Sequence, residues 1–163
     1  MEILRNLSSR IPGAPSFIYN EFVKSETAIR LNIVNNPNEE QWQCIEKLAV
    51  NVLQPLRNVF GAIKISSGFR SVALCNAVGS NSFSNHAKGQ AADIEPYDHD
   101  ITLMMLANFI HDKLNFQELI LEYFPNGWVH VAYRENVNEK EIKLKDPTHN
   151  YTRMSWNDII SLY

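Results

Sequence analysis

Two histidines and an aspartate are the residues of this sequence whose types and spacing suggest metal chemistry. His86 lies in a polar loop, and Asp93 follows at the end of a run of small residues. Because Gly89 and the alanines after it leave room for the loop to fold back, we expect both side chains to face one point. His130 lies in a segment of alternating pattern, so it shares one strand face with Trp128.

Two histidines and one carboxylate, with a fourth position open, are the ligand pattern of a catalytic zinc site. A structural zinc site more often has four ligands, frequently cysteine, whereas Cys44 and Cys75 lie far apart in no metal-binding pair. We expect these cysteines to be buried free thiols, with a disulfide between them as the alternative. A set of two histidines and a carboxylate also binds iron in oxygenases, usually in a different sequence arrangement. Each of the three residues alone is more often an ordinary surface or core residue, so the prediction of one Zn²⁺ ion depends on their combination.

A general base is expected beside the metal. If residues 125–127 form a three-residue hairpin loop, Glu122 pairs with His130 across the hairpin. Directly opposed side chains have Cβ atoms about 4.5–5.5 Å apart on one face, so we expect Glu122 to project towards the metal and act as the base. Glu118 shares this face but lies further along the strand. The alternative is that both glutamates are solvent-facing strand residues, since a one-residue change of loop length would move Glu122 out of opposition.

Three further residues, Arg70, Ser84 and Trp128, are candidates for contact with a substrate. A guanidinium beside a zinc site can bind a carboxylate or a carbonyl bidentately, whereas an isolated arginine usually forms a surface salt bridge. Trp128 suits the wall of a cleft and suits the core equally well. We therefore expect a substrate-binding surface next to the metal, in which Arg70 orients the substrate.

The elements that must position these residues follow from hydrophobic spacing and capping residues. The clearest is a helix over Glu39–Phe60, which begins with a capping box formed by Asn38 and Gln41. One or two short helical turns are expected over Glu21–Arg30. Further helices are expected over Ser71–Val78, Asp100–Leu114 and after Ser155, and strands over Ile63–Ser67, Gln90–Ile94, Gln117–Phe124 and Trp128–Tyr133. This order predicts an α+β fold, in which a small antiparallel sheet carries the zinc site and packs against the N-terminal and inserted helices.

Length and composition indicate a single globular domain. The chain has 163 residues, of which 45% are hydrophobic, enough for one core. We expect one domain over residues 1–163, with an irregular lead-in over 1–16 and a tail over 134–163 that ends in a short helix. The formal net charge of −3 gives no general attraction to nucleic acid or to an anionic membrane, and no segment is long and apolar enough to span a bilayer. We expect a monomer with neither of these partners.

At these residues the sequence resembles the zinc D-alanyl-D-alanine carboxypeptidases and related peptidoglycan peptidases, a group that includes phage endolysins. The similarity extends over about Phe17–Tyr133, and its most specific segments are Ser67–Ser71, Ser84–Asp93 and Trp128–His130. The resemblance implies a fold of the kind shared by lysostaphin-type enzymes and the hedgehog signalling domain. It also implies that His86, Asp93 and His130 bind zinc and that Arg70 lies near the substrate.

The sequence departs from this family pattern at one position. Many relatives carry the catalytic carboxylate three residues before the last histidine, and Gly127 occupies that position here. The general base must then come from another position, and the predicted hairpin register indicates Glu122.

The resemblance implies zinc-dependent hydrolysis of peptide bonds in the stem peptides of peptidoglycan. A carboxypeptidase would remove the terminal D-alanine, whereas an endolysin-type endopeptidase would cut within the stem. A rival from another class is a zinc-bearing binding module or virion structural module of the same fold, without catalysis. Since residues 1–16 lack the pattern of a signal peptide, we expect synthesis in a cytoplasm and action on the cell wall after release, as for a phage-encoded enzyme.

Overall fold

The computed structural model describes residues 5–163, so residues 1–4 of the expected lead-in lie outside the described residues. Where the sequence predicts an irregular lead-in, the structure has a two-stranded antiparallel hairpin of β1 (Arg10–Ile11) and β2 (Ala14–Ile18). Gly13, with a φ of 79°, permits the tight turn between the two strands. Pro12 and Gly13 therefore form a turn between two strands.

The helical first half follows the sequence prediction. Two short helices, α1 (Asn20–Val23) and α2 (Glu26–Arg30), come directly after the hairpin. The predicted long helix consists of α3 (Glu39–Leu48), a π-helical turn over Ala49–Leu53, and α4 (Gln54–Phe60).

The long helix begins and packs as its sequence pattern predicts. Asn38 Oδ1 accepts from Gln41 N at 2.9 Å, and Gln41 Oε1 accepts from Asn38 N at 2.8 Å, so the capping box is confirmed. The buried stripe of the helix consists of Trp42, Ile45, Leu48, Ala49, Val52, Leu53 and Leu56.

The main sheet has six strands, which run in the order β3-β4-β6-β5-β7-β8. Their bounds are β3 (Ile63–Ser67), β4 (Ala91–Pro96), β5 (Glu118–Glu122), β6 (Trp128–Ala132), β7 (Glu141–Lys145) and β8 (Thr152–Arg153). Neighbouring strands are antiparallel except β5 and β7, which are parallel. The α+β class is confirmed, but the prediction of an antiparallel sheet is wrong for β7. After β6 the chain crosses back through residues 133–140, and β7 then joins the free edge of β5 in the same direction.

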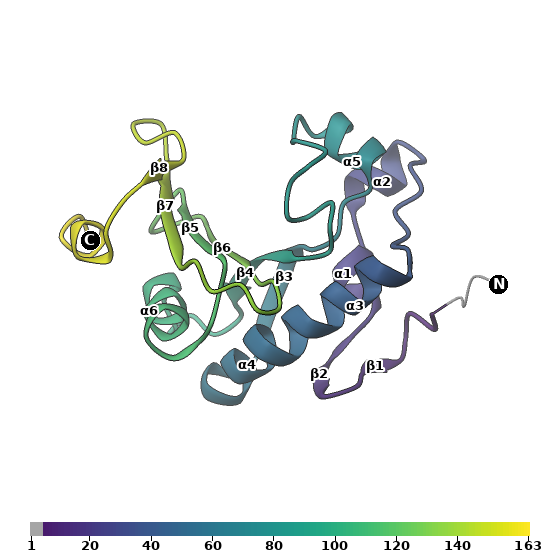
Figure 1. Cartoon of the computed structure of the whole chain (residues 1–163), viewed down its shortest axis with the longest axis horizontal. Coiled ribbons are helices and arrows are strands. Elements are labelled where there is room, and N and C mark those ends of the chain that lie inside the picture. The colour runs from purple at the N-terminus through teal and green to yellow at the C-terminus, as the bar shows by residue number, and fades with distance from the viewer. Residues whose placement is uncertain (1–4) are drawn as a thin grey trace.

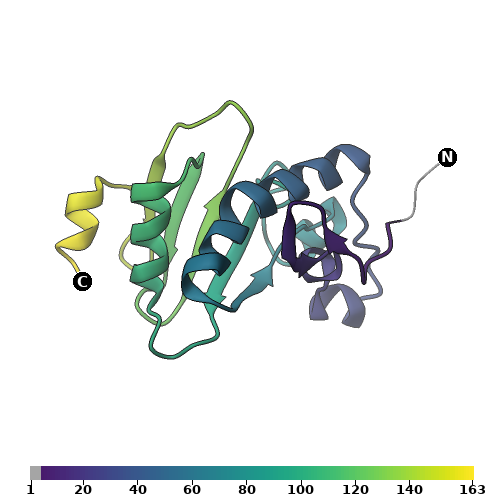
Figure 2. The ribbon, with the colours of Figure 1, turned by 90° about the horizontal axis from the view of Figure 1, so that it is seen from below.

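Helices cover one face of this sheet, and the opposite face carries polar residues of the central strands together with Ile120 and Trp128. The helix α6 (Leu103–Lys113) contacts β5 and β6, while α4 contacts β3 and α6. Figure 2 shows α6 and the long helix on the same side of the strands. Alternate residues of the central strands point into the apolar core beneath these helices, namely Ala92, Ile94, Leu119, Leu121, Val129 and Val131.

The remaining helices lie at the two ends of the molecule. In Figure 1, α5 (Val72–Ala77) stands next to α2, on the side away from β7 and β8. The helix α7 (Trp156–Ile160) follows β8 and is capped by Ser155, as predicted. Within residues 5–163, no helix has the length and apolar character that a membrane crossing requires. Cys44 and Cys75 are both free thiols, as predicted, although Cys44 is only partly buried.

The hairpin between β5 and β6 differs from the predicted register. Ile120, not Glu122, pairs with His130, so the predicted pairing is wrong by two residues. The loop has five residues (123–127), because Tyr123 adopts a left-handed φ of 54° and its N–H bonds to the backbone of β7. A two-residue shift leaves side chains on the same face, so Glu122 remains on the face of His130.

Candidate active site

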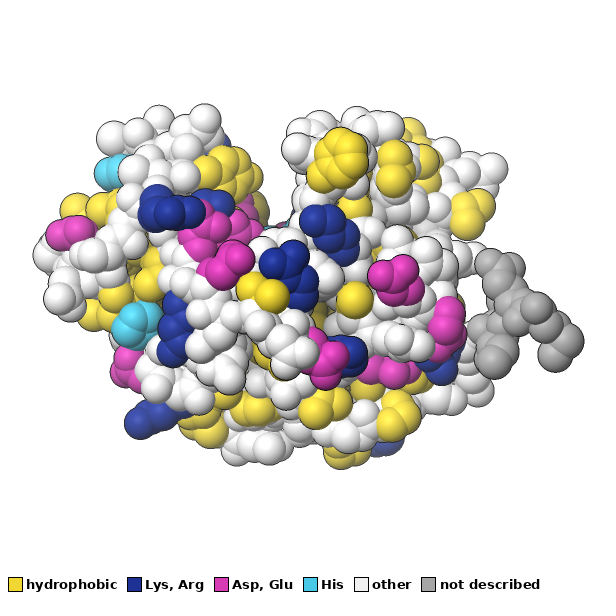
Figure 3. Space-filling model, viewed as in Figure 1, with side chains coloured by type: hydrophobic (Ala, Val, Ile, Leu, Met, Phe, Trp, Pro, Cys, Tyr) yellow, Lys and Arg dark blue, Asp and Glu magenta, His cyan; other side chains and the backbone are white. Residues whose placement is uncertain are grey.

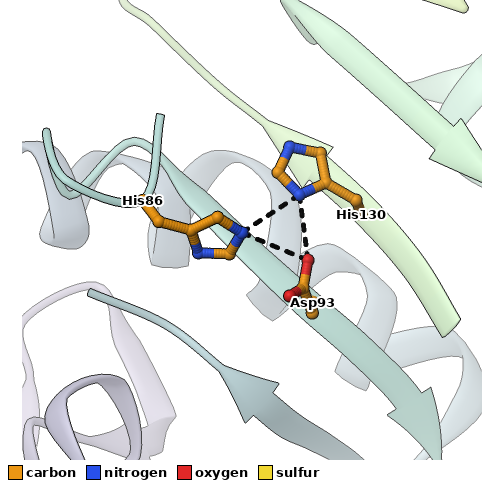
Figure 4. Close-up of side chains that lie close together, drawn as sticks. All are labelled: His86, Asp93 and His130. Atoms are coloured by element: carbon orange, nitrogen blue, oxygen red, sulfur yellow. Dashed lines mark hydrogen bonds and ion pairs between the residues drawn. The ribbon is translucent and has the colours of Figure 1, made fainter. Parts of the chain in front are cut away.

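The three predicted metal ligands meet on the sheet face opposite the helices. Asp93 of β4 and His130 of β6 pair directly across the two strands, and the loop before β4 brings His86 over them. Figure 4 shows His86 Nε2, Asp93 Oδ1 and His130 Nδ1 turned towards one another. His86 Nε2 lies 3.2 Å from each of the other two atoms, which are 2.9 Å apart. All three residues are buried, and together they form a group able to hold a metal ion.

The loop that carries His86 is fixed against the long helix. Gln41 of α3 donates from Nε2 to Ala87 O at 3.0 Å. Gly89 has a φ of 71°, and a Cβ at this position would lie 2.6 Å from Gln41 O, so the close approach requires glycine. Ser84 Oγ accepts from Ala87 N at 3.3 Å and closes the turn that presents His86. The small residues therefore let the loop fold back, as the sequence predicts.

The second ring nitrogen of each histidine faces an oxygen atom. His86 Nδ1 donates to Gly68 O at 2.7 Å, and His130 Nε2 lies 3.4 Å from Glu118 Oε1. These acceptors favour an N–H at both positions, so His86 Nε2 and His130 Nδ1 direct their lone pairs towards Asp93 and towards each other.

Two lone pairs and a carboxylate at such short separation require a cation between them. A tetrahedral ion with ligands about 2.0–2.2 Å away keeps the ligand atoms about 3.3 Å or slightly further apart. The three distances of 2.9–3.2 Å are within a few tenths of an ångström of that value. The donor set therefore fits Zn²⁺, for which imidazole and carboxylate are common ligands.

In the metal-free protein a proton serves as this cation. Burial alone would lower the pKa of His130, but its hydrogen bond with Asp93 and the neighbouring Glu118 raise it to about 9. Burial lowers the pKa of His86, which stays neutral. Burial opposes ionisation of Asp93 as well, yet the two histidines hold the pKa of its carboxyl well below the usual range. The site is thus anionic at Asp93 and carries one displaceable proton at His130 near neutral pH.

Glu118 is a fixed negative charge behind the metal centre. It lies two residues from Ile120, the residue opposite His130, and so approaches the imidazole diagonally. Lys143 Nζ lies 2.6 Å from Glu118 Oε2. Although burial raises the pKa of Glu118, the contacts with His130 and Lys143 lower it to about 2. Sequence reasoning placed Glu118 on the correct face but missed its contact with His130, because the predicted register was two residues off.

Glu122 lies on the other diagonal from His130 and is in a different electrostatic state. Burial, together with the negative charge of Asp93, raises the pKa of Glu122. The side chain is buried and forms no ion pair within residues 5–163. Two carboxylates whose pKa values are shifted in opposite directions are typical of an acid–base site. Glu122 is the one with the raised proton affinity that a general base needs.

Arg70 supports the metal ligands directly. Its Nη2 donates to Asp93 Oδ2 at 3.0 Å, and its Nε donates to Ser67 Oγ at 2.8 Å. One carboxylate oxygen of Asp93 therefore contacts the two histidines, and the other accepts a hydrogen bond from the guanidinium of Arg70. Arg70 does form a salt bridge, but not the surface salt bridge that was the alternative from sequence. Its partner is Asp93, and the two side chains are largely buried within the site.

Ser84 and Trp128 both line the same cleft as the ligands and Glu122. Ser84 also has the structural role of capping the turn before His86. Trp128 is half-buried, pairs with Glu122 across the hairpin and packs its ring against Tyr123, with centroids 5.6 Å apart. Of the two positions considered for Trp128, the cleft wall is the one observed.

The cleft has a volume of about 1200 Å³, and the metal ligands and Glu122 form part of its lining. Figure 3 shows it as a notch between the part that carries α2 and α5 and the part that carries β7 and β8, with basic side chains on both rims. Three lining residues come from the C-terminal region: Lys143, Lys145 and Tyr151. Sequence reasoning missed them, although the alternating pattern of Glu141–Lys145 is a strand signal.

Comparison with protein families places the chain among peptidases. Residues 15–132 match the family described as Peptidase M15, which is most of the chain. No curated protein matches the chain as an individual relative. The matched range contains the three candidate ligands and both flanking glutamates, and it ends at the last residue of β6.

Proposed function

Because the chain belongs to the Peptidase M15 family, a family of zinc-dependent peptidases, we propose that it hydrolyses peptide bonds in the stem peptides of peptidoglycan. The observation that carries this proposal is the convergence of His86 Nε2, Asp93 Oδ1 and His130 Nδ1 in a cleft that also contains Glu122. A purely structural zinc site would not require an adjacent carboxylate without an ion-pair partner in a cleft of about 1200 Å³.

In the proposed reaction His86, Asp93 and His130 hold the metal. Bound zinc would supply an activated water and a polarised scissile carbonyl. Glu122 accepts the proton of the attacking water at its carboxylate and delivers it to the nitrogen of the leaving amine. The raised pKa of Glu122 suits both transfers, because the group must bind the proton and then release it.

Two other side chains maintain the geometry of this reaction. Arg70 holds Asp93 through Nη2 and orients the substrate from the wall of the cleft. Glu118 faces Nε2 of His130 and keeps the imidazole in the tautomer that presents Nδ1 to the metal. Neither residue needs to exchange a proton with the substrate.

The test is product mapping on purified peptidoglycan and on a synthetic stem pentapeptide. We expect hydrolysis that is lost on chelation and restored by zinc. Release of terminal D-alanine would identify a carboxypeptidase, and cleavage within the stem would identify an endopeptidase. If the zinc-bound protein hydrolyses neither substrate, the proposal is contradicted and the non-catalytic module is favoured. The observation that motivates this rival is Gly127, which stands where the resemblance implies a catalytic carboxylate.

The Glu122→Gln variant tests the assignment of the base. We expect kcat to fall about 10²- to 10⁴-fold, while zinc content is unchanged because Glu122 is not one of the three ligands. The matched control is Glu40→Gln, an exposed residue of α3 outside the cleft, which should retain activity. Full activity of Glu122→Gln would contradict the assignment of this residue as the base.

A further inference from the structure

The wall of the cleft beside Glu122 is built by a part of the chain that lies beyond the family match. Residues 15–132 match the family, whereas Lys145 and Tyr151 belong to β7 and the β7–β8 loop. The parallel pairing of β5 with β7 places Lys145 directly beside Glu122, and Tyr123 N bonds to Lys145 O at 2.7 Å. The register therefore puts a cation next to the proposed base.

Lys145 differs from Arg70 and Lys143 in having no acidic partner among the residues that the structure describes. Arg70 is paired with Asp93, and Lys143 is paired with Glu118. Lys145 Nζ instead donates to Asn150 Oδ1 at 2.8 Å, and no carboxylate of residues 5–163 lies within ion-pair distance of it. An ammonium group has three donors, so the contact with Asn150 leaves donors of Lys145 available to bind an anion.

Tyr151 also contacts this ammonium. Lys145 Nζ lies 4.9 Å from the centre of the Tyr151 ring, within the range of a cation–π contact. Tyr151 has a left-handed φ of 54°, an uncommon backbone state for an aromatic residue. The strained backbone places a half-exposed ring on the cleft wall instead of in the core. Burial and the nearby charge of Glu122 raise the pKa of Tyr151, so its hydroxyl remains a hydrogen-bond donor.

We propose that Lys145 and Tyr151 form a subsite that binds a carboxylate of the peptide substrate on the Glu122 side of the metal centre. This inference rests on the proposed function, because it assumes a peptide in the cleft. An unpaired ammonium and a phenolic hydroxyl on one wall are complementary to a carboxylate, which accepts several hydrogen bonds and carries the opposite charge. Asn150 and the Tyr151 ring fix the ammonium without neutralising it. The subsite gives the enzyme a preference for acidic peptides.

The experiment measures binding, so that it is independent of turnover. Calorimetry is performed on the zinc-loaded Glu122→Gln protein with three synthetic stem pentapeptides: one with free carboxylates, one amidated at the glutamate residue and one amidated at the C-terminus. We expect one of the two amidations to weaken binding about tenfold, as for loss of a charge-assisted hydrogen bond.

The same titrations on lysine variants assign the effect to the subsite. Lys145→Gln should weaken binding of the preferred peptide about tenfold and leave binding of the amidated peptide unchanged, and Lys145→Arg should restore the preference. Lys113→Gln, an exposed residue of α6 outside the cleft, is the matched control and should behave as the parent protein.

Two outcomes would overturn the inference. One is equal binding of all three peptides by the parent protein, or no binding of any of them. The other is an equal loss of affinity for acidic and amidated peptides in Lys145→Gln, which would indicate a structural role for the lysine. A carboxylate preference that depends on Lys145 in a protein that cleaves no stem peptide would support the subsite while contradicting the proposed function.

Discussion

Glu118 Oε1 lies 3.4 Å from Nε2 of His130, whose other nitrogen, Nδ1, lies 2.9 Å from Asp93 Oδ1. The imidazole is therefore held between two carboxylates, one at the metal position and one behind it. Lys143 holds Glu118 in turn, with Nζ 2.6 Å from Oε2. This arrangement orients the last ligand before any metal binds, and it favours an N–H at Nε2 once the proton on Nδ1 is displaced.

The first prediction concerns this supporting carboxylate. Glu118→Gln should lower zinc affinity about 10- to 100-fold, the usual effect of removing a group that orients a histidine ligand. Competition with a chelating dye measures the change. The matched control is Glu141→Gln, which also loses a contact with Lys143 but does not touch His130. Equal zinc affinity of Glu118→Gln and wild type would show that Glu118 does not orient the ligand.

The second prediction concerns the stability of the metal-free protein as a function of pH. The folded-state pKa of His130, about 9, lies above the ordinary value of 6.5. The group therefore contributes stability that is fully present below pH 6.5 and is lost as pH rises through 9. The loss should be on the order of 3 kcal/mol in the free energy of unfolding, measured by denaturant titration of the metal-free protein. His130→Gln should lack this loss, and an equal decline in both proteins would rule out His130 as its source.

The third prediction concerns the proton that zinc displaces. Because His130 is protonated below about pH 9 in the metal-free protein, binding of zinc must release that proton. Apparent zinc affinity should then rise about tenfold per pH unit between pH 7 and 9. Calorimetry in two buffers of different ionisation enthalpy counts the released protons, and we expect about one at pH 7.5. Binding without proton release at this pH would refute the protonated state.

The fourth prediction concerns Gly127, which occupies the position where the resemblance implies a carboxylate. A Cβ at this position would lie 1.8 Å from the backbone oxygen of Glu122. The hairpin must therefore shift to accept any side chain. Gly127→Ala should lower the free energy of unfolding by about 1–3 kcal/mol. Thermal unfolding measures this loss of stability. The control is Asn126→Ala, a substitution at the neighbouring exposed residue. Unchanged stability of Gly127→Ala would show that the hairpin is not constrained as described.

Much of the fold was predictable because its signals are local. The capping box of Asn38 and Gln41 fixed the start of the long helix, and the alternation around His130 identified a strand. The ligand residues could be recognised for a similar reason, since the small residues between His86 and Asp93 permit the loop to fold back.

The parts that could not be predicted depend on contacts between distant segments. The register of the β5–β6 hairpin changed because Tyr123 leaves the strand and bonds to β7, a strand that the sequence analysis did not identify. The contact between Glu118 and His130 follows from that register. The placement of Tyr151 depends on a left-handed backbone state that has no sequence signal at a tyrosine.

Titration of the metal-free protein with zinc, while hydrolysis of a stem pentapeptide is followed, tests the central claim most directly. We predict that activity rises in proportion to added zinc up to one equivalent per chain and then stays constant, and that Asp93→Asn abolishes this rise. Undiminished hydrolysis by the metal-free protein, or saturation with zinc without any hydrolysis, would contradict the account.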